Sequence, residues 1–332
     1  MILLTGGLGF IGSHTAVSLI NSGFEIIIID NLYNTNITVL ESIKKIVTKP
    51  EKIHFYQGDM LNLNDIEYVF KNYQIDSVIH FASLKSVGES VQKPLLYYNT
   101  NLKILFNLLE IMEKYNCNKI IFSSSCTVYG SSIAPFDEKM ITGIGVTCPY
   151  GQTKYFQEEI LKDICKIKKN FTAIILRYFN PAGAHESGLI GELPNDTPNN
   201  LLPYILKVAI GKKNELEVYG GDYNTNDGSC IRDYIHVMDV ADGHVITLQK
   251  CSNGLHIYNL GCGKGTSVLE MIKTFENVNN IKIAYKIIDR RYGDIETSYG
   301  LVDKIYNELG WFTKKDITNI CKDGYNFIKN NI

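Results

Sequence analysis

The sequence carries almost no excess of charge of either sign. Its 33 lysines and arginines nearly balance 35 aspartates and glutamates, and the net charge of the 332-residue chain is −2. This balance gives no support for a surface that binds nucleic acid or a membrane. No run approaches the roughly 18 apolar residues that a membrane-spanning helix requires. Because the N-terminus enters an apolar strand directly, we expect no signal peptide and a cytoplasmic protein.

Patterns typical of disulfide frameworks and metal sites are also missing. The eight cysteines form no C-x-x-C pair, and the seven histidines show no metal-ligand spacing. Several of the cysteines lie inside apolar runs, as buried thiols do. We therefore expect reduced thiols and no metal site. The sequence contains no internal repeat and no low-complexity linker.

Three glycines near the N-terminus form the first informative motif. Gly6, Gly9 and Gly12 follow an apolar run at 1–4 and precede a segment of helical period at 11–20. A tight strand-to-helix turn needs residues without a Cβ atom, so that backbone N–H groups can approach a pyrophosphate. The positive end of the helix then attracts the phosphate charge. The spacing predicts a dinucleotide cradle.

An acidic residue at the end of the next predicted strand supports this interpretation. Asp30 closes the apolar run 26–29 and follows Gly12 by 18 residues, near the spacing of about 20 expected for a ribose-binding acid. Its carboxylate can accept a hydrogen bond from a ribose 2′-hydroxyl but repels a 2′-phosphate, so we expect NAD and not NADP. The alternative is a glycine turn in another α/β protein. The strand, the helix and the acid together favour the dinucleotide.

Apolar strand patterns alternate with segments of helical period through the first half of the chain. The sequence predicts strands at 2–4, 26–30, 54–58, 77–82, 119–124 and 172–178, and helices near 12–21, 38–47, 64–73, 94–115 and 150–168. This alternation predicts an α/β fold with a Rossmann-type, doubly wound parallel sheet. Dense proline, glycine and asparagine at 181–203 predict a smaller mixed α/β lobe. We expect a NAD-binding domain at 1–180, with 231–250 packing back onto it, and a substrate-binding lobe at 181–332.

A tyrosine and a lysine lie four residues apart on the predicted helix 150–168. Tyr150 and Lys154 therefore share one helix face. A tyrosine acts as a base near neutral pH only if its pKa falls by about 3, roughly 4 kcal/mol of preferential phenolate stabilisation. A neighbouring ammonium and a cationic nicotinamide can supply this stabilisation. Ser125 ends the fifth predicted strand and could hydrogen-bond a substrate oxygen. Such pairs also occur on ordinary helix surfaces, but beside a dinucleotide cradle they predict nicotinamide chemistry at a carbon bearing a hydroxyl.

The chain resembles the extended short-chain dehydrogenase/reductase family and, within it, the group of UDP-glucose 4-epimerases. The similarity extends nearly from end to end. The segments that carry it are Gly6–His14, Asp30–Asn31, Gly58–Asp59, His80–Ala82, Val87–Ser90, Ser123–Gly130, Arg177–His185 and Arg232–Val237. The last two segments are more specific to the epimerases than the glycine turn is. The resemblance implies an isomerase that retains NAD and acts on a UDP-sugar.

The resemblance also implies a role for individual residues. The implied catalytic residues are Ser125, Tyr150 and Lys154. In the implied reaction, Tyr150 removes the proton from the sugar O4 and the C4 hydride passes to NAD⁺. The hydride later returns to the other face of the 4-keto sugar. Implied cofactor contacts are Gly6, Gly9, Phe10, Ile11, Gly12, Asp30, Asn31, Asn34, Asp59, Met60, Phe81, Ala82, Lys85, Thr100, Tyr150, Lys154 and Phe179. Implied substrate contacts are Lys85, Ser125, Tyr150, Asn180, Asn200, Leu201, Tyr219, Arg232, Arg291, Asp294 and Ser298.

Some of these residue types fit their implied roles on physical grounds. Two arginines suit a diphosphate, and the ring of Tyr219 can stack on uracil. Thr100 departs from the family pattern, in which this cofactor-contact position is commonly asparagine. Its hydroxyl can replace part of that contact, so we expect a modest effect on NAD retention.

Other functions stay open to different degrees. A 4,6-dehydratase requires acidic residues just after the strand-end serine, but Ser125 is followed by Cys126, Thr127, Val128 and Tyr129. The missing carboxylate argues against a dehydratase, and a UDP-glucuronate decarboxylase is a further alternative within the family. A UDP-glucuronate 4-epimerase would need a carboxylate-binding group, which the sequence does not identify. A non-catalytic NAD sensor would have lost the tyrosine or the lysine, and this chain retains both.

Two further expectations concern assembly and substrate width. The segment 94–115 has apolar residues on more than one face, and relatives pair this helix and the tyrosine-bearing helix with their copies, so we expect a homodimer. Ser298 matches a position that is a large aromatic in relatives restricted to UDP-glucose and UDP-galactose, and small in relatives that also accept N-acetylated sugars. A tyrosine ring would collide with an N-acetyl group. Serine leaves room, so we expect turnover of UDP-GlcNAc and UDP-GalNAc as well.

Overall fold

The computed structural model describes residues 1–193, 200–291 and 294–331. The chain forms two compact units, one from 1–131, 141–178 and 241–258, the other from 132–140, 179–240 and the chain from 259 onward. The segment 132–140 differs from the expected division, because the backbone of Phe136 pairs with Tyr299 and Leu301 of the second unit. The expected division also placed 231–250 with the first unit, whereas 231–240 belongs to the second unit and 241–258 to the first. Residues from 254 onward add the strand β11 to the sheet of the first unit.

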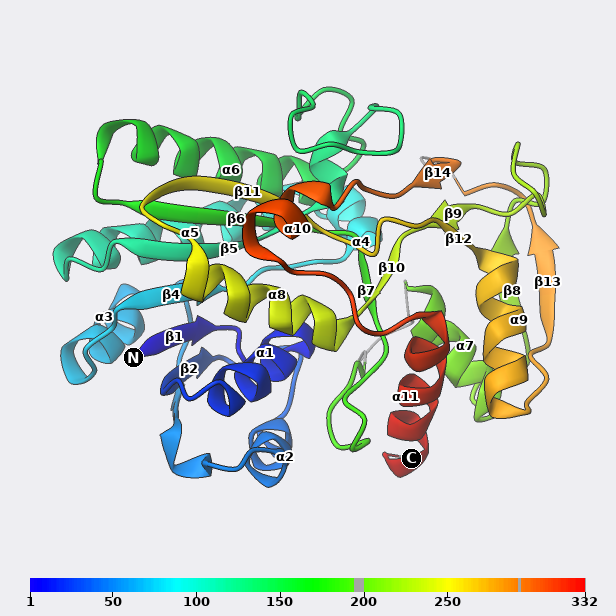
Figure 1. Ribbon diagram of the computed structural model, residues 1–332, viewed down its shortest axis with the longest axis horizontal. Coiled ribbons are helices and arrows are strands. Elements are labelled where there is room, and N and C mark those ends of the chain that lie inside the picture. Colours follow the sequence, from blue (N-terminus) through cyan, green and yellow to red (C-terminus); the bar gives the residue numbers. More distant parts are fainter. Residues whose placement is uncertain (194–199, 292–293, 332) are drawn as a thin grey trace. The chain divides into compact units, whose positions relative to one another are not determined.

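A seven-stranded sheet forms the centre of the first unit (Figure 1). Its order is β11–β6–β5–β4–β1–β2–β3, and β1 to β6 pair in parallel. The strands are β1 (Ile2–Thr5), β2 (Ile26–Asp30), β3 (Ile53–Gln57), β4 (Ser77–His80), β5 (Lys119–Ser125), β6 (Thr172–Tyr178) and β11 (Gly254–Leu260). The Rossmann-type sheet is confirmed. The first six strands lie within two residues of their predicted bounds, whereas β11 was not predicted.

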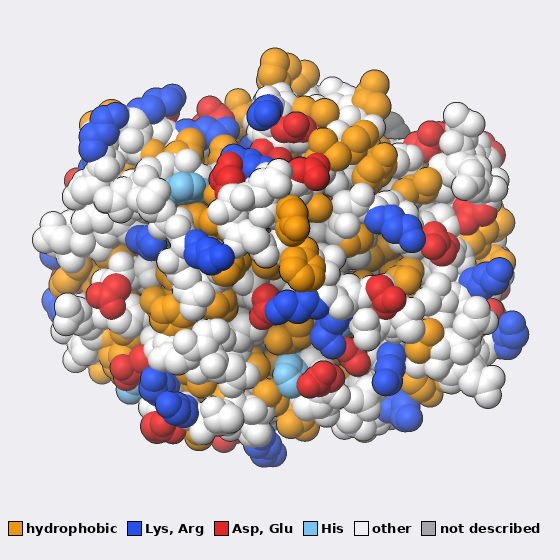
Figure 2. Space-filling view, viewed as in Figure 1, with side chains coloured by type: hydrophobic (Ala, Val, Ile, Leu, Met, Phe, Trp, Pro, Cys, Tyr) orange, Lys and Arg blue, Asp and Glu red, His pale blue; other side chains and the backbone are white. Residues whose placement is uncertain are grey.

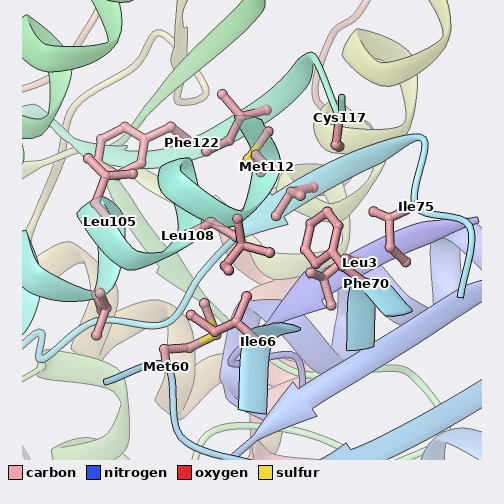
Figure 3. Packing of buried hydrophobic residues seen from close by; sticks show 14 of the residues in the cluster. Leu3, Met60, Ile66, Phe70, Ile75, Leu105, Leu108, Met112, Cys117 and Phe122 are labelled. Carbon is pink, nitrogen blue, oxygen red and sulfur yellow. The ribbon is translucent and has the colours of Figure 1, made fainter. Parts of the chain in front are cut away.

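Helices cover this sheet and close its core. They are α1 (Phe10–Asn21), α2 (Thr38–Ile46), α3 (Leu63–Asn72), α4 (Val87–Gln92), α5 (Pro94–Lys114), α6 (Pro149–Ile167) and α8 (Val237–Lys250), and α5 packs beside α6 (Figure 1). Figure 3 shows Leu105, Leu108 and Met112 of α5 directed toward apolar side chains of the sheet and of α3. This packing holds the carboxyl ends of the strands, where ligands of such sheets bind, in fixed positions.

The second unit is built from short strands and four helices within the described residues. The helices are α7 (Leu201–Ala209), α9 (Val268–Asn279), α10 (Asp303–Leu309) and α11 (Ile317–Asn330). The parallel pairs are β7 (Asn180–Ala182) with β10 (Tyr234–His236), and β8 (Leu216–Tyr219) with β13 (Tyr285–Ile288). A third sheet places β9 (Ile231–Arg232) between β12 (Thr266–Ser267) and β14 (Thr297–Ser298). Buried side chains of α7, α9 and α11 form the core of this unit.

Two features of the structure bear on membrane contact and on surface charge. In the part of the chain that the structure describes, no helix is long and apolar enough to cross a membrane. Figure 2 shows acidic and basic side chains interspersed on the face that it draws. This distribution agrees with the near-zero net charge of the sequence.

Candidate active site

The glycine turn has the geometry that a dinucleotide cradle requires. Gly6 has a φ of +66°, in the left-handed region. A Cβ atom on Gly12 would lie 2.7 Å from the carbonyl oxygen of Gly6, so a side chain there would collide with the backbone. The helix α1 begins after Gly9, and no side chain caps its first N–H groups. These residues fit a pyrophosphate, because the turn is open to close approach and the helix end supplies donors.

Asp30 lies at the carboxyl end of β2 beside this turn. Its carboxylate accepts hydrogen bonds from the backbone N–H groups of Leu8 (3.0 Å) and Leu32 (2.9 Å). Burial raises the pKa of Asp30, while these two hydrogen bonds oppose the rise. A carboxylate offers about four lone-pair sites, so two are left for the hydroxyls of a ribose. The geometry therefore fits the role predicted for this acid.

Several other predicted cofactor residues gather near the same strand ends. Asn31 donates to the Asp59 carboxylate at 3.2 Å, and the amide of Ala82 donates to the backbone of Thr5, beside Gly6. The ammonium of Lys85 lies 6.0 Å from the ring centroid of Phe10. The remaining members of the set in this unit are Ile11 on α1, exposed Asn34, buried Met60, half-buried Phe81 and half-buried Thr100 on α5.

Three residues on one face of α6 contact three consecutive serines at the end of β5. The hydroxyl of Tyr150 hydrogen-bonds Ser125, and the Lys154 ammonium donates to the carbonyl oxygen of Ser123 at 2.7 Å. Ser124 donates to the Glu158 carboxylate at 2.6 Å. The spacing of four residues between these α6 side chains places them on one helix face. The structure thus brings the predicted catalytic trio together.

Burial shifts the pKa values of the tyrosine and the lysine in opposite directions. It raises the pKa of the Tyr150 hydroxyl, although the hydrogen bond with Ser125 opposes this rise. It lowers the pKa of Lys154 to about 7, because a buried ammonium loses its hydration. The Lys154 ammonium lies 5.8 Å from the centroid of the Tyr150 ring. The groups of this chain alone therefore do not produce the lowered tyrosine pKa that the sequence interpretation requires.

A buried ion pair adjoins the trio and was not predicted. The guanidinium of Arg177 donates to both carboxylate oxygens of Glu158, at 3.0 and 2.7 Å, and to the Tyr129 hydroxyl at 3.1 Å. The side chains of Arg177 and Glu158 are 1% and 0% exposed. The sequence did contain one signal, because Glu158 continues the spacing of Tyr150 and Lys154. The partner on β6 could not be read from that spacing.

In the second unit, two arginines share one carboxylate. Arg291 donates to both oxygens of Asp294, at 3.2 and 2.9 Å, and an Arg232 nitrogen lies 3.7 Å from the same group. The guanidinium of Arg291 also lies 5.3 Å from the ring centroid of Tyr219. These four predicted substrate residues thus form one cluster, and two guanidinium groups can hold a diphosphate.

Three further predicted residues of this unit, Ser298, Asn180 and Phe179, have defined backbone or ring partners. Ser298 on β14 is buried and is the register partner of Arg232 on β9. The amide of Asn180 donates to the carbonyl of Asp233 at 2.9 Å. The ring of Phe179, which was predicted to contact the cofactor, stacks on Phe136 with centroids 6.2 Å apart.

Two further predicted substrate residues lie at the start of α7. Asn200 precedes this helix and Leu201 is its first residue. Within 1–193, 200–291 and 294–331, no group of three or more histidine, cysteine, aspartate or glutamate side chains could hold a metal ion.

Comparisons with known proteins agree with this geometry. The model of the NAD dependent epimerase/dehydratase family matches residues 2–261. The UDP-glucose 4-epimerase of Haemophilus influenzae is 52% identical over 99% of this chain and 98% of its own length. The structure of UDP-glucose 4-epimerase from Bifidobacterium longum, in complex with NAD⁺ and UDP, has a TM-score of 0.95 at 47% identity and covers 99% of this chain and 98% of its own.

A second solved structure gives the same result. UDP-glucose-4-epimerase from Stenotrophomonas maltophila, with bound NAD and formylated UDP-arabinopyranose, has a TM-score of 0.96 at 41% identity, covering 99% of this chain and 98% of its own. These relatives confirm the resemblance inferred from the sequence, together with the predicted isomerase class and the NAD cofactor. The chain therefore belongs to the NAD-dependent epimerase/dehydratase family.

Proposed function

We propose that this protein interconverts UDP-galactose and UDP-glucose by transient oxidation at the sugar C4. The observation that carries the proposal is the contact of Tyr150 with Ser125, on a helix face shared with Lys154, in the unit that contains the dinucleotide turn. A base beside a nicotinamide site suits removal of a hydroxyl proton and a hydride from one carbon. When bound, NAD supplies the acceptor and later the donor of that hydride.

Each residue of the trio has a distinct task in this reaction. Tyr150 accepts the proton of the 4-hydroxyl as the C4–H bond breaks, and it returns a proton to the oxygen when C4 regains hydrogen on the opposite face. Ser125, whose oxygen already accepts from the amide and hydroxyl of Thr127 at 3.2 and 3.0 Å, hydrogen-bonds the sugar oxygen and the tyrosine. Lys154 stabilises the phenolate by its positive charge.

The cluster of Arg232, Arg291, Asp294 and Tyr219 binds the UDP part of the substrate. The guanidinium groups take the diphosphate, and the tyrosine ring stacks on uracil. Asn180, Asn200 and Leu201 complete this contact set, as the family resemblance implies. The small side chain of buried Ser298, beside Arg232, leaves room for an N-acetyl group, so UDP-GlcNAc and UDP-GalNAc are substrates too.

The apolar outer faces of α5 and α6 support a homodimer. Leu95, Leu96 and Phe106 on α5 are 77%, 42% and 50% exposed, and Phe156 on α6 is 42% exposed. The two helices pack together, so these side chains can form one surface for a second copy. A cytoplasmic location fits the eight free thiols, since such thiols persist in a reducing compartment.

Parallel incubations with UDP-galactose, UDP-GalNAc and UDP-galacturonate test the proposal. We expect the first two to reach equilibrium with their 4-epimers, resolved by chromatography. Conversion of UDP-galacturonate alone would favour the UDP-glucuronate epimerase that the sequence left open. Absence of any epimer with all three sugars would exclude the proposed reaction.

A further inference from the structure

A buried carboxylate in the second unit connects the segments that carry the proposed substrate contacts. Asp233 follows Arg232 and is 0% exposed. One of its oxygens accepts from the amide and the thiol of Cys262, at 2.7 and 3.1 Å. The other accepts from the amides of Gly263 and Gly300, at 3.2 and 3.4 Å. All four donors belong to two loops that are distant from Asp233 in the sequence.

The backbone of Asp233 also hydrogen-bonds two residues of the proposed substrate site. Its amide donates to the carbonyl of Ser298 at 3.0 Å, and its carbonyl accepts from the amide of Asn180 at 2.9 Å. Both of these partners are proposed to contact the UDP-sugar. A Cβ atom on Gly261 would lie 2.4 Å from the Asp233 carboxylate, so the 261–263 loop wraps closely around it. Asp233 therefore ties the segment that carries the sugar-facing serine to Asn180 and to this loop.

Phe136 and Asn259 hold the segment 298–301 from its other side. The amide of Phe136 donates to the carbonyl of Tyr299 at 2.9 Å, and the amide of Leu301 donates to the carbonyl of Phe136 at 2.8 Å. The side chain of Asn259 donates to the carbonyls of Phe136 and Leu301, at 2.9 and 3.1 Å. Residues 298–301 are thus held between Phe136 and Asp233 and have little freedom to shift.

We propose that Asp233 is a positioning residue. It holds the segment 298–301, which forms one wall of the proposed sugar site, in position and thereby determines how the sugar fits, without contacting the reacting atoms. This inference rests on the proposed function, because it takes residue 298 as part of the sugar site. A carboxylate can serve two loops at once because both of its oxygens accept hydrogen bonds. An amide cannot do this, since its NH₂ group must face one of the two pairs of donors.

The test compares Asp233→Asn with Asp323→Asn. Asp323 is also buried in the second unit, where it accepts from His236 and Lys315, both at 3.2 Å, and it serves as a control for a general loss of stability. For Asp233→Asn we expect the KM for UDP-galactose to rise about 10- to 100-fold, with kcat changed less than about threefold. The variant loses hydrogen bonds that hold the segment 298–301, so the substrate should bind less tightly in the ground state and in the transition state alike. The bound NAD content should equal that of the wild type.

Hydrogen exchange provides a readout that does not depend on turnover. In the wild type without substrate, the amides of Cys262, Gly263 and Gly300 should already be protected, and in Asp233→Asn they should exchange about 10- to 100-fold faster, in line with the lost hydrogen bonds. Unprotected amides in the wild type would overturn the inference, even if the variant failed to fold. An equal rise in KM for Asp323→Asn would also overturn it.

These outcomes separate the inference from the proposed function. If the wild type binds no UDP-sugar but the three amides lose protection in the variant, then the proposed function fails, and the role of Asp233 in the fit of the sugar fails with it, although Asp233 still holds the two loops. If the wild type is an active epimerase and the variant keeps its KM and its protection, the positioning role fails alone.

Discussion

The buried pair of Glu158 and Arg177 should make the stability of the protein sensitive to the loss of either charge alone. Replacing either residue by methionine leaves the other charge buried without its partner. In Glu158→Met, the guanidinium of Arg177 keeps only the Tyr129 hydroxyl at 3.1 Å. In Arg177→Met, the carboxylate keeps the Ser124 hydroxyl at 2.6 Å and the Lys162 ammonium at 3.6 Å.

These contacts set the expected magnitudes. Breaking a buried pair from one side costs about 3–5 kcal/mol, and Glu158→Met should lie at the upper end because its remaining partner is neutral. Arg177→Met should lie near the lower end, since a second cation is close. The double variant loses both charges together and removes one hydrogen bond each from the hydroxyls of Tyr129 and Ser124, at no more than about 1–3 kcal/mol each. It should therefore lose much less stability than the sum of the two single variants.

Urea unfolding at fixed NAD concentration, followed by far-ultraviolet circular dichroism, measures these losses. The single tryptophan, Trp311, belongs to the second unit, so its fluorescence would not report on α6. Lys162→Met is the matched control, because this lysine pairs with Glu158 and Glu159 but is 18% exposed, and such pairs contribute about 0–1 kcal/mol. Losses that add within about 0.5 kcal/mol would refute the reasoning, because additivity means that the two side chains do not interact.

Four further predictions concern function. The Tyr150→Phe variant should keep its NAD but lower turnover by a factor on the order of 10² to 10⁴. The control Tyr155→Phe, on the same helix, should retain turnover. Full activity of the Tyr150→Phe variant would remove this tyrosine from the mechanism. The purified protein should release NAD on denaturation without supplementation, and a supernatant free of nucleotide would contradict a retained cofactor. Light scattering should give twice the 37.5 kDa chain mass. The double variant Phe106→Glu with Phe156→Glu should be a monomer, whereas the control Leu255→Glu should stay a dimer; a wild type that is a monomer at every concentration would exclude the dimer. Ser298→Tyr should abolish turnover of UDP-GalNAc and spare UDP-galactose, while a wild type inactive on UDP-GalNAc would refute the assignment of Ser298.

Five of the six predicted parallel strands could be recognised because they are buried on both faces, whereas the edge strand β3 is mostly half-buried. Runs such as 26–29, with four isoleucines, can only be core strands when helical segments alternate with them. The strand β11 could not be recognised in this way, because its first four residues are partly or fully exposed and only its last three are buried. The helix α4 was also missed, since it has only six residues and one of them is buried.

The proposed catalytic residues could be singled out in the sequence because their chemistry needs few residue types at a short spacing. Each motif is local in the sequence, since Tyr150 and Lys154 lie four residues apart and the glycine turn covers 6–12. The partners of Asp233 and Arg177 are not local, because they lie tens of residues away on other elements. A lone aspartate or arginine in a sequence is more often exposed than buried. Only the fold shows that these two charges are enclosed and hydrogen-bonded.

The chain between Ser125 and Tyr150 shows why sequence distance and structural role diverge in this protein. After Ser125 the chain forms a short 3₁₀ turn, contributes 132–140 to the second unit, and returns to begin α6 with Pro149. Within that excursion, Phe136 pairs with Tyr299 and Leu301, the residues that follow the serine of the proposed sugar site. The segment that separates two of the proposed catalytic residues in the sequence therefore also supports the proposed sugar site. The hydrogen bonds of Phe136 are made by its backbone, and its ring stacks on Phe179. A smaller side chain at 136 would therefore act by loosening this packing beside residues 299–301, and we expect its effect first in KM.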